Sequence, residues 1–396
     1  MNTTIISIVI ILVILSIFLF INFDYKSKYK KSEKDLYYEA LDLLLLGKLK
    51  EAYATLLALI KNDTENVKAY LKLGQVLREI GKPDKALKVH RSLLIRRDLT
   101  NYEKIELYKS IALDYKHLNN INEAIDQCKK IIKVDKNNEW ALLELIELYK
   151  SIDDWHSSKE FLQTYQKITG NVDSRIIGLY IVKQGMIELN KNEFIKARSL
   201  FEEGLNLDNE LSICYKLMGD TYSEESELEH QKSEESDNPE LLEKAKELLS
   251  SALSMWIKYA QNKSEYSKFV LPLIKDSLFA LDRYSELEFI LKDLVDRDPN
   301  DIDALVNLAD YYSNQGENQK SIDLLDSLNQ KDKESYIVKM LRLKLKIHLD
   351  NSLSEVIKDE FDEITKEMLN MTDDSLSLEL QDEDFKWLNE NGEVKQ

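Results

Sequence analysis

The feature that most constrains this fold is an internal repeat. A small residue that follows a short turn recurs at intervals of 34, 38, 34 and 39 residues, at Ala52, Ala86, Ala124, Ser158 and Ala197. Apolar residues at helical spacing stand on both sides of each turn. A near-constant period of this length indicates one supersecondary unit stacked many times, with each copy burying the apolar face of the next.

The clearest copy spans residues 67–98 and resembles the tetratricopeptide repeat, a helix-turn-helix unit of 34 residues. Gly74 lies on its first helix and Ala86 on its second, with a turn at residues 81–83 between them. Small side chains at these positions let two antiparallel helices approach closely. The 396 residues include 10 glycines and 4 prolines, too few for a fold rich in hairpins. The sequence predicts an all-α solenoid of about eight units over residues 35–222 and 239–350.

Two segments depart from the period. Residues 223–238 are polar and acidic and fall between the two helices of one unit, so we expect an acidic insertion that forms an exposed loop or a frayed helix end. Residues 351–396 are predicted to form a capping helix near 355–369 and an acidic tail. The tail contains Phe385, Trp387 and Leu388, which suit either a loosely ordered end or a short docking motif.

The first residues predict a membrane anchor. Thr3 to Phe23 are 21 residues without a charge, which span about 30 Å as a helix. A cleaved signal peptide is the alternative, but no positive charge precedes the run and no small-residue cleavage site follows it. We expect a transmembrane segment at 1–23 and a basic juxtamembrane segment at 24–34. Its lysines are Lys26, Lys28, Lys30, Lys31 and Lys34. Because basic residues stay on the cytoplasmic side, they predict an inner-membrane protein with an external N-terminus and cytoplasmic repeats.

Composition and motifs argue against several kinds of chemistry. A net charge of −18 gives no overall attraction to nucleic acid. Cys128 and Cys214 form no CxxC pair, and Cys128 is expected as a buried thiol on an apolar helix face. The five histidines lack metal-ligand spacing, and no glycine-rich phosphate loop occurs. We therefore predict no metal, no cofactor, no catalytic residues and no enzymatic activity.

A protein-binding groove is the better candidate for function. In stacked helix pairs, the first helix of each unit lines the inner groove. The predicted partner-binding residues there are Gln75, Arg78, Lys109, Lys116, Trp140 and Lys150. Such a basic stripe beside an indole suits an extended peptide or an acidic segment of a partner. The alternative is that these are ordinary solvated cations on surface helices.

The combination of anchor, basic segment and repeats resembles the lipopolysaccharide assembly protein B family of Gram-negative bacteria. Residues 69–100 look like its second repeat, with a central His90, and Asp114-Tyr115 and Asp154-Trp155 look like parts of its next units. The resemblance implies an inner-membrane adaptor that presents the deacetylase committing carbon to lipid A to a membrane-bound AAA+ protease. That family ends in a rubredoxin-like zinc module with two CxxC knuckles. This tail has no cysteine, so no zinc-dependent role is carried over.

Two other functions remain open from the sequence. One is a general membrane-tethered scaffold or co-chaperone with other clients. The other is a substrate-selecting arm for a separate catalytic subunit.

Overall fold

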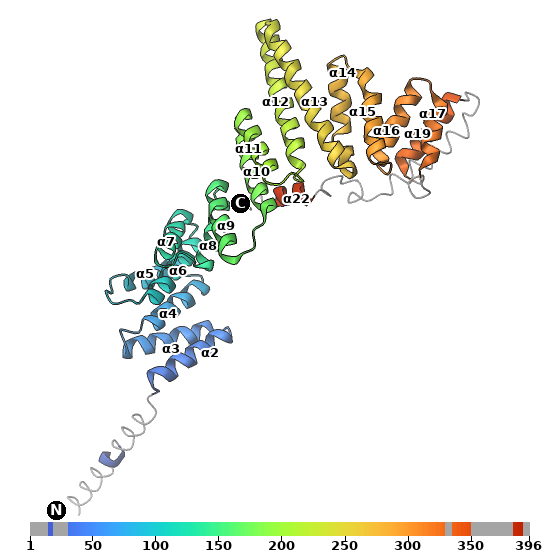
Figure 1. Cartoon of the computed structure of the whole chain (residues 1–396). Coiled ribbons are helices and arrows are strands. Elements are labelled where there is room, and N and C mark those ends of the chain that lie inside the picture. The colour runs from blue at the N-terminus through green and yellow to red at the C-terminus, as the bar shows by residue number, and fades with distance from the viewer. Residues whose placement is uncertain (1–14, 19–30, 329–334, 350–382, 391–396) are drawn as a thin grey trace, which may run out of the picture. The chain divides into compact units, whose positions relative to one another are not determined.

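The computed structural model describes residues 15–18, 31–328, 335–349 and 383–390 (Figure 1). These residues form helices and turns without a strand, so the predicted all-α fold is confirmed. The chain divides into two compact units, unit 1 at 1–153 and unit 2 at 154–396. Most of the apolar run at 3–23 lies outside the described residues. In the part that is described, no helix is both long and apolar enough to cross a membrane.

Unit 1 is a series of helix pairs. Its helices are α2 (Glu33–Leu45), α3 (Leu49–Asn62), α4 (Val67–Glu79), α5 (Pro83–Leu93), α6 (Asn101–His117), α7 (Ile121–Val134) and α8 (Glu139–Lys150). Helices α2 and α3, α4 and α5, and α6 and α7 pack as consecutive pairs. The small residues of the repeat are fully buried at Ala52, Ala86 and Ala124. They face their partner helices, as the period predicted.

Gly74 shows how tightly one pair is packed. A methyl group added there would lie 2.1 Å from Nε2 of His90 on α5. The same pairing of a glycine with a large side chain recurs in unit 2, where Gly185 faces Phe201 and Gly219 faces Trp256. In each pair the glycine therefore makes room for the ring of the second helix.

Unit 2 continues the series. Its helices are α9 (Trp155–Thr169), α10 (Ser174–Asn190), α11 (Phe194–Leu207), α12 (Ile213–Ser236), α13 (Pro239–Asn262), η1 (Ser264–Phe269), α14 (Leu271–Ala280), η2 (Tyr284–Glu286), α15 (Leu287–Arg297), α16 (Ile302–Asn314), α17 (Asn318–Ser327), α19 (Tyr336–Leu349) and α22 (Glu383–Glu390). One apolar core runs from Leu179 on α10 to Tyr312 on α16 and includes Leu388 on α22. The expected capping helix near 355–369 lies outside the described residues.

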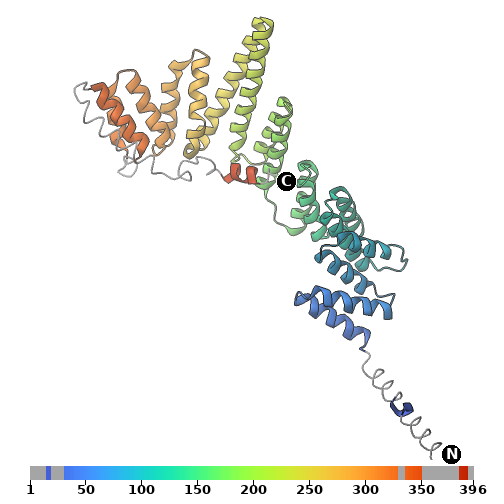
Figure 2. The ribbon, with the colours of Figure 1, turned by 180° about the vertical axis from the view of Figure 1, so that it is seen from behind.

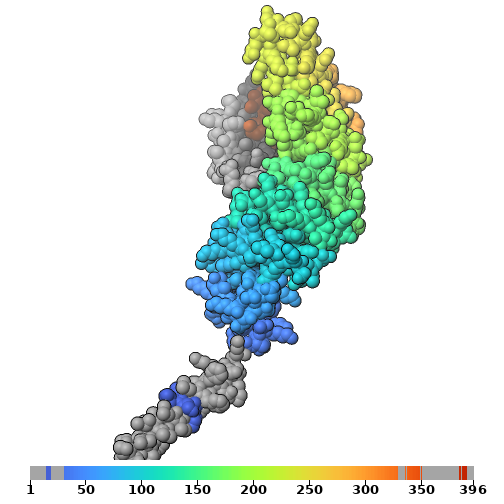
Figure 3. All heavy atoms as spheres, turned by 90° about the vertical axis from the view of Figure 1, so that its left-hand side faces the viewer, coloured from blue at the N-terminus to red at the C-terminus, as the bar shows by residue number. Residues whose placement is uncertain are grey.

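Of the two structures predicted for the acidic segment 223–238, the exposed loop was wrong, because the segment is helical. Helix α12 continues to Ser236, and α13 starts at Pro239. The spacing from Gly219 to Trp256 is 37 residues, against 16 from Gly185 to Phe201, so the extra residues lengthen both helices of the pair. The tip of this hairpin, in yellow, rises beyond the green α10–α11 pair (Figure 3).

Side-chain chemistry explains why the segment is helical. Glutamate, the commonest residue of the segment, is a good helix former despite its polarity. Ser226 lies inside the hairpin and donates to the carbonyl oxygen of Ala245 at 2.6 Å. Ser233 donates to the carbonyl oxygen of Asn238 at 2.9 Å, across the turn. The hairpin is thus held by buried hydroxyls as well as by apolar contacts.

Candidate functional site

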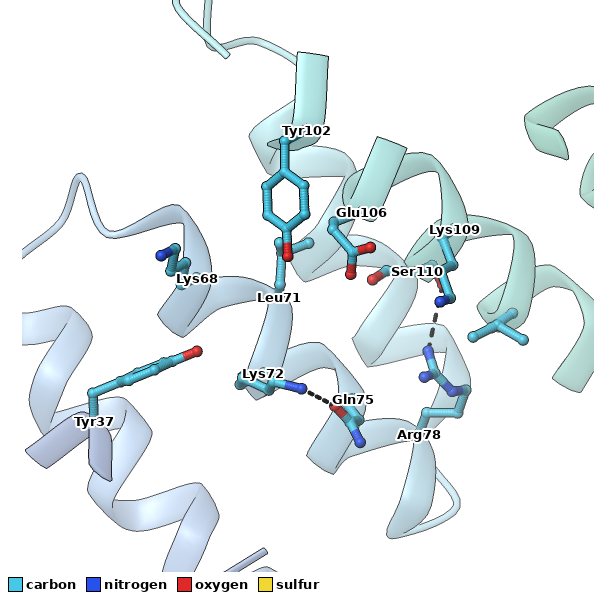
Figure 4. A pocket seen from close by; sticks show the side chains of 11 residues that line it. Tyr37, Lys68, Leu71, Lys72, Gln75, Arg78, Tyr102, Glu106, Lys109 and Ser110 are labelled. Carbon is cyan, nitrogen blue, oxygen red and sulfur yellow. Dashed lines mark hydrogen bonds between the residues drawn. The ribbon is translucent and has the colours of Figure 1, made fainter. Parts of the chain in front are cut away.

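Unit 1 contains a hollow of about 430 Å³ formed by the first helices of three successive repeats, α2, α4 and α6 (Figure 4). We call it the α4–α6 hollow. Its lining residues are Tyr37, Lys68, Leu71, Lys72, Gln75, Arg78, Tyr102, Glu106, Lys109, Ser110 and Leu113. A groove lined by first helices is what the repeat pattern predicted.

Four cations and one carboxylate line the hollow, so its charge is positive in a chain of net charge −18. The hydroxyls of Tyr37 and Tyr102 point into the same space (Figure 4). Burial raises the pKa of the Tyr37 phenol, so this group stays neutral and keeps its donor hydrogen. Leu71 and Leu113 add apolar surface. This set of groups suits a segment with carboxylates and an apolar side chain.

Hydrogen bonds position two of the polar side chains. Lys72 donates to Oε1 of Gln75 at 2.9 Å (Figure 4). Nε2 of Gln75 donates to Oε1 of Glu79 at 2.9 Å. Lys109 extends from α6, with its ammonium 4.9 Å from the centre of the Trp140 ring on α8. The indole therefore orients a cation of the hollow.

The six predicted partner-binding residues separate into two groups. Gln75, Arg78 and Lys109 line the hollow, whereas Lys116, Trp140 and Lys150 are absent from its lining. Lys116 pairs with Glu144 at 2.5 Å and Lys150 with Glu147 at 3.2 Å. The role of all six in partner binding stays a prediction.

Arg78 is not the solvated cation that the sequence suggested. Its side chain is 11% exposed, and its Nη1 donates to Oδ1 of the buried Asp114 at 2.7 Å. The other oxygen of Asp114 lies 2.5 Å from Nδ1 of His90, which is also buried. Nε2 of His90 lies 3.1 Å from the carbonyl oxygen of Leu71. Asp114 therefore links α4, α5 and α6 through charged hydrogen bonds.

Tyr37, Lys72, Tyr102 and Ser110 line the hollow but were not predicted to do so. The repeat itself held a signal for Tyr37, since it stands 34 residues before Leu71 and so occupies the same position of the preceding unit. The other three fall outside the positions that the repeat predicts to face the groove, which are 68, 71, 75 and 78 on α4 and 106, 109, 113 and 116 on α6. Their contribution depends on side-chain reach, which spacing alone does not give.

Of the juxtamembrane lysines, Lys26, Lys28 and Lys30 lie outside the described residues. Lys31 pairs with Glu39 at 2.6 Å, and Lys34 belongs to α2. Their effect on membrane topology stays a prediction.

The described residues hold no group of His, Cys, Asp and Glu side chains that could bind a metal ion. Cys128 and Cys214 are both buried free thiols, as expected for Cys128. Burial raises the pKa of each thiol to about 12, so neither is a ready nucleophile.

Comparison with known proteins adds one line of evidence. Lipopolysaccharide assembly protein B of Escherichia coli K12 is 20% identical over 263 residues, which cover 66% of this chain and 66% of that protein. The proteins of that name from E. coli O6:H1 and O157:H7 match equally. The chain resembles lipopolysaccharide assembly protein B. This confirms the resemblance predicted from the sequence, although the match spans just under two thirds of those relatives. No protein family model matches the chain.

Solved structures of tetratricopeptide repeat proteins are also similar. One from Parabacteroides merdae is 14% identical and covers 67% of this chain and 98% of its own, with a TM-score of 0.34. One from Thermus thermophilus is 13% identical and covers 48% of this chain and 98% of its own, with a TM-score of 0.29. Scores this low do not establish a shared arrangement of the repeats.

Proposed function

We propose that this protein is a non-enzymatic, membrane-anchored adaptor that regulates lipopolysaccharide synthesis by binding other proteins through its repeats. The observation that carries the proposal is the α4–α6 hollow. It gathers Lys68, Lys72 and Lys109 from two successive first helices around apolar surface. Such a surface favours an acidic segment of a partner and disfavours basic ones.

The anchor gives the adaptor its place in the cell. The uncharged run at 3–23 and the lysines that follow it support a single span with the repeats in the cytoplasm. Confinement to the inner membrane raises the effective concentration of membrane-bound partners, so weak docking suffices. Deletion of residues 1–23 is expected to leave the repeats folded and to impair function in cells.

The resemblance to lipopolysaccharide assembly protein B supports specific partners. We propose that the hollow holds a segment of the lipid A deacetylase, or of the membrane AAA+ protease that degrades it. The adaptor then brings enzyme and protease together and sets the enzyme's lifetime.

The test removes the cations of the hollow without touching Arg78, because Arg78 neutralises a buried carboxylate. The variant is Lys68→Ser, Lys72→Ser and Lys109→Ser. Its matched control is Lys82→Ser, Lys85→Ser and Lys88→Ser, which removes the same charge from exposed positions on or beside α5. Both are expressed at the native level in cells, where deacetylase half-life and lipopolysaccharide content are measured.

We expect the hollow variant to change both quantities as depletion of the protein does, and the control to match the unaltered chain. Partner affinity should fall at least tenfold, about 1.4 kcal/mol, and should weaken further with salt. Equal behaviour of the two variants would exclude the hollow as the docking site. Chaperones in place of these partners in membrane pull-downs would favour the co-chaperone alternative.

A further inference from the structure

The C-terminal helix α22 lies against α10, in red beside green (Figures 1 and 2). The two helices are about 200 residues apart in the sequence and belong to the same unit. Of the two interpretations of the tail, the structure supports the docking motif for residues 383–390.

Two polar contacts hold α22. Nη2 of Arg175 donates to both carboxylate oxygens of Asp384, at 2.7 and 2.8 Å. The buried ammonium of Lys183 donates to the carbonyl oxygen of Leu388 at 2.9 Å, near the end of α22 where a helix carries partial negative charge. One contact therefore recognises an acidic side chain, and the other recognises the end of a short helix.

Apolar contacts add side-chain selectivity. The ring of Trp387 lies 5.6 Å from that of Tyr180 and 6.1 Å from that of Trp155, measured between centroids. Trp155 and Tyr180 are themselves 5.2 Å apart in an edge-to-face arrangement. Leu388 is fully buried in the core of unit 2. The surface thus accepts an indole and, beside it, a leucine.

The size of α22 bears on how firmly it is held. A helix of eight residues is too short to be stable alone in water, so its helical form depends on docking. Its attachment to the same chain supplies a high local concentration. A short helix that is held in this way can be displaced by a similar segment of another protein, if that segment is present at sufficient concentration.

We propose that Trp155, Arg175, Tyr180 and Lys183 form a second protein-binding site, the α10 site, and that α22 is its internal ligand. The partner it takes is a protein segment that forms a short acidic helix, with an aspartate followed by tryptophan three positions later and leucine four positions later. Binding of that segment displaces α22. The α10 site lies in unit 2 and its residues are separate from those of the α4–α6 hollow, so neither proposal depends on the other.

The probe is a fluorescent synthetic peptide of residues 381–392, and binding is measured by anisotropy with the full chain. The chain variant Asp384→Arg with Trp387→Ala is designed to unseat α22 and leave the α10 site intact. We expect this variant to bind the peptide at least tenfold more tightly than the unaltered chain, because the internal competitor is weakened. A folded variant that does not bind would show that α22 is a fixed part of the fold, and would overturn the proposal.

Reversing the charges of both partners tests the contact between Arg175 and Asp384. Adding Arg175→Glu to the unseated variant should weaken peptide binding at least tenfold, and a peptide carrying Asp384→Arg should restore it. The control Lys196→Glu, at an exposed position of α11, should leave binding unchanged. Equal loss with both substitutions, or no rescue, would contradict recognition through Arg175.

A second measurement uses the unaltered chain and does not depend on the variant folding. Excess unlabelled peptide should increase amide hydrogen exchange in residues 383–390 at least tenfold and leave α10 protected. Unchanged exchange would overturn the proposal. Concentration-dependent dimers that disappear on unseating α22 would assign the α10 site to a second copy of this chain and would also overturn it.

Discussion

Arg78 in unit 1 and Arg175 in unit 2 make a useful comparison, because both stand on the first helix of a repeat and both pair with an aspartate. Arg78 pairs with Asp114, which lies 36 residues away in the next repeat. Arg175 pairs with Asp384, which lies 209 residues away in the tail, and makes a longer contact of 3.5 Å with Asp208, 33 residues away. The first pair joins neighbouring repeats, and the second holds a separate segment on the surface. The role of an arginine on a first helix therefore becomes clear only once its carboxylate partner is located.

The largest expected effect comes from removing the carboxylate that joins the repeats. Asp114→Ala leaves the charge of Arg78 uncompensated in a largely buried place and removes the hydrogen-bond partner of Nδ1 of His90. We expect the free energy of unfolding to fall by about 3–5 kcal/mol. Urea denaturation followed by circular dichroism measures the change. The exposed Asp126 on α7 is the matched control, and Asp126→Ala should stay within about 0.5 kcal/mol of the unaltered chain.

Smaller losses of stability are expected for two cations that line the same hollow, and the two losses should differ. Arg78→Ser removes a charged hydrogen bond from buried Asp114, and we expect a loss of about 1.5–3 kcal/mol in unfolding free energy. Lys109→Ser removes a partly exposed cation from the face of Trp140 and should cost less than about 1 kcal/mol. The same denaturation experiment checks both. Equal losses would mean that Arg78 does not stabilise the contact between the repeats.

Much of the fold was predictable from local pattern. The buried positions Ala52, Ala86 and Ala124 follow from the period, because a small residue is needed wherever two helices approach closely. The insertion at 223–238 was not predictable from polarity alone. Its polarity suggested a loop, but helix propensity and a few buried serines decided the structure. The turn that ends α12, at Asp237 and Asn238 before Pro239, is the sequence signal that was available.

The candidate site was predictable in position but not in detail. Repeat offsets placed Gln75, Arg78 and Lys109 on the groove face, where they line the hollow. They did not reveal that Asp114 neutralises Arg78, because that contact joins two different repeats. The α10 site was still harder to predict, since Arg175 and Asp384 are brought together only by the folded unit. The aromatic residues of the tail are visible in the sequence, but the sequence does not show which residues of the repeats they pack against.

The most direct test of the central claim asks what touches the α4–α6 hollow in the cell. A photo-crosslinking amino acid is placed at Ser110, which lines the hollow, or at Lys88, an exposed position on α5. Covalent adducts formed in intact cells are purified and identified by mass spectrometry. We expect the crosslinker at Ser110 to capture the lipid A deacetylase or the membrane protease, and the crosslinker at Lys88 to capture neither. Capture of these proteins from Lys88 but not from Ser110 would show that the partner does not dock in the hollow.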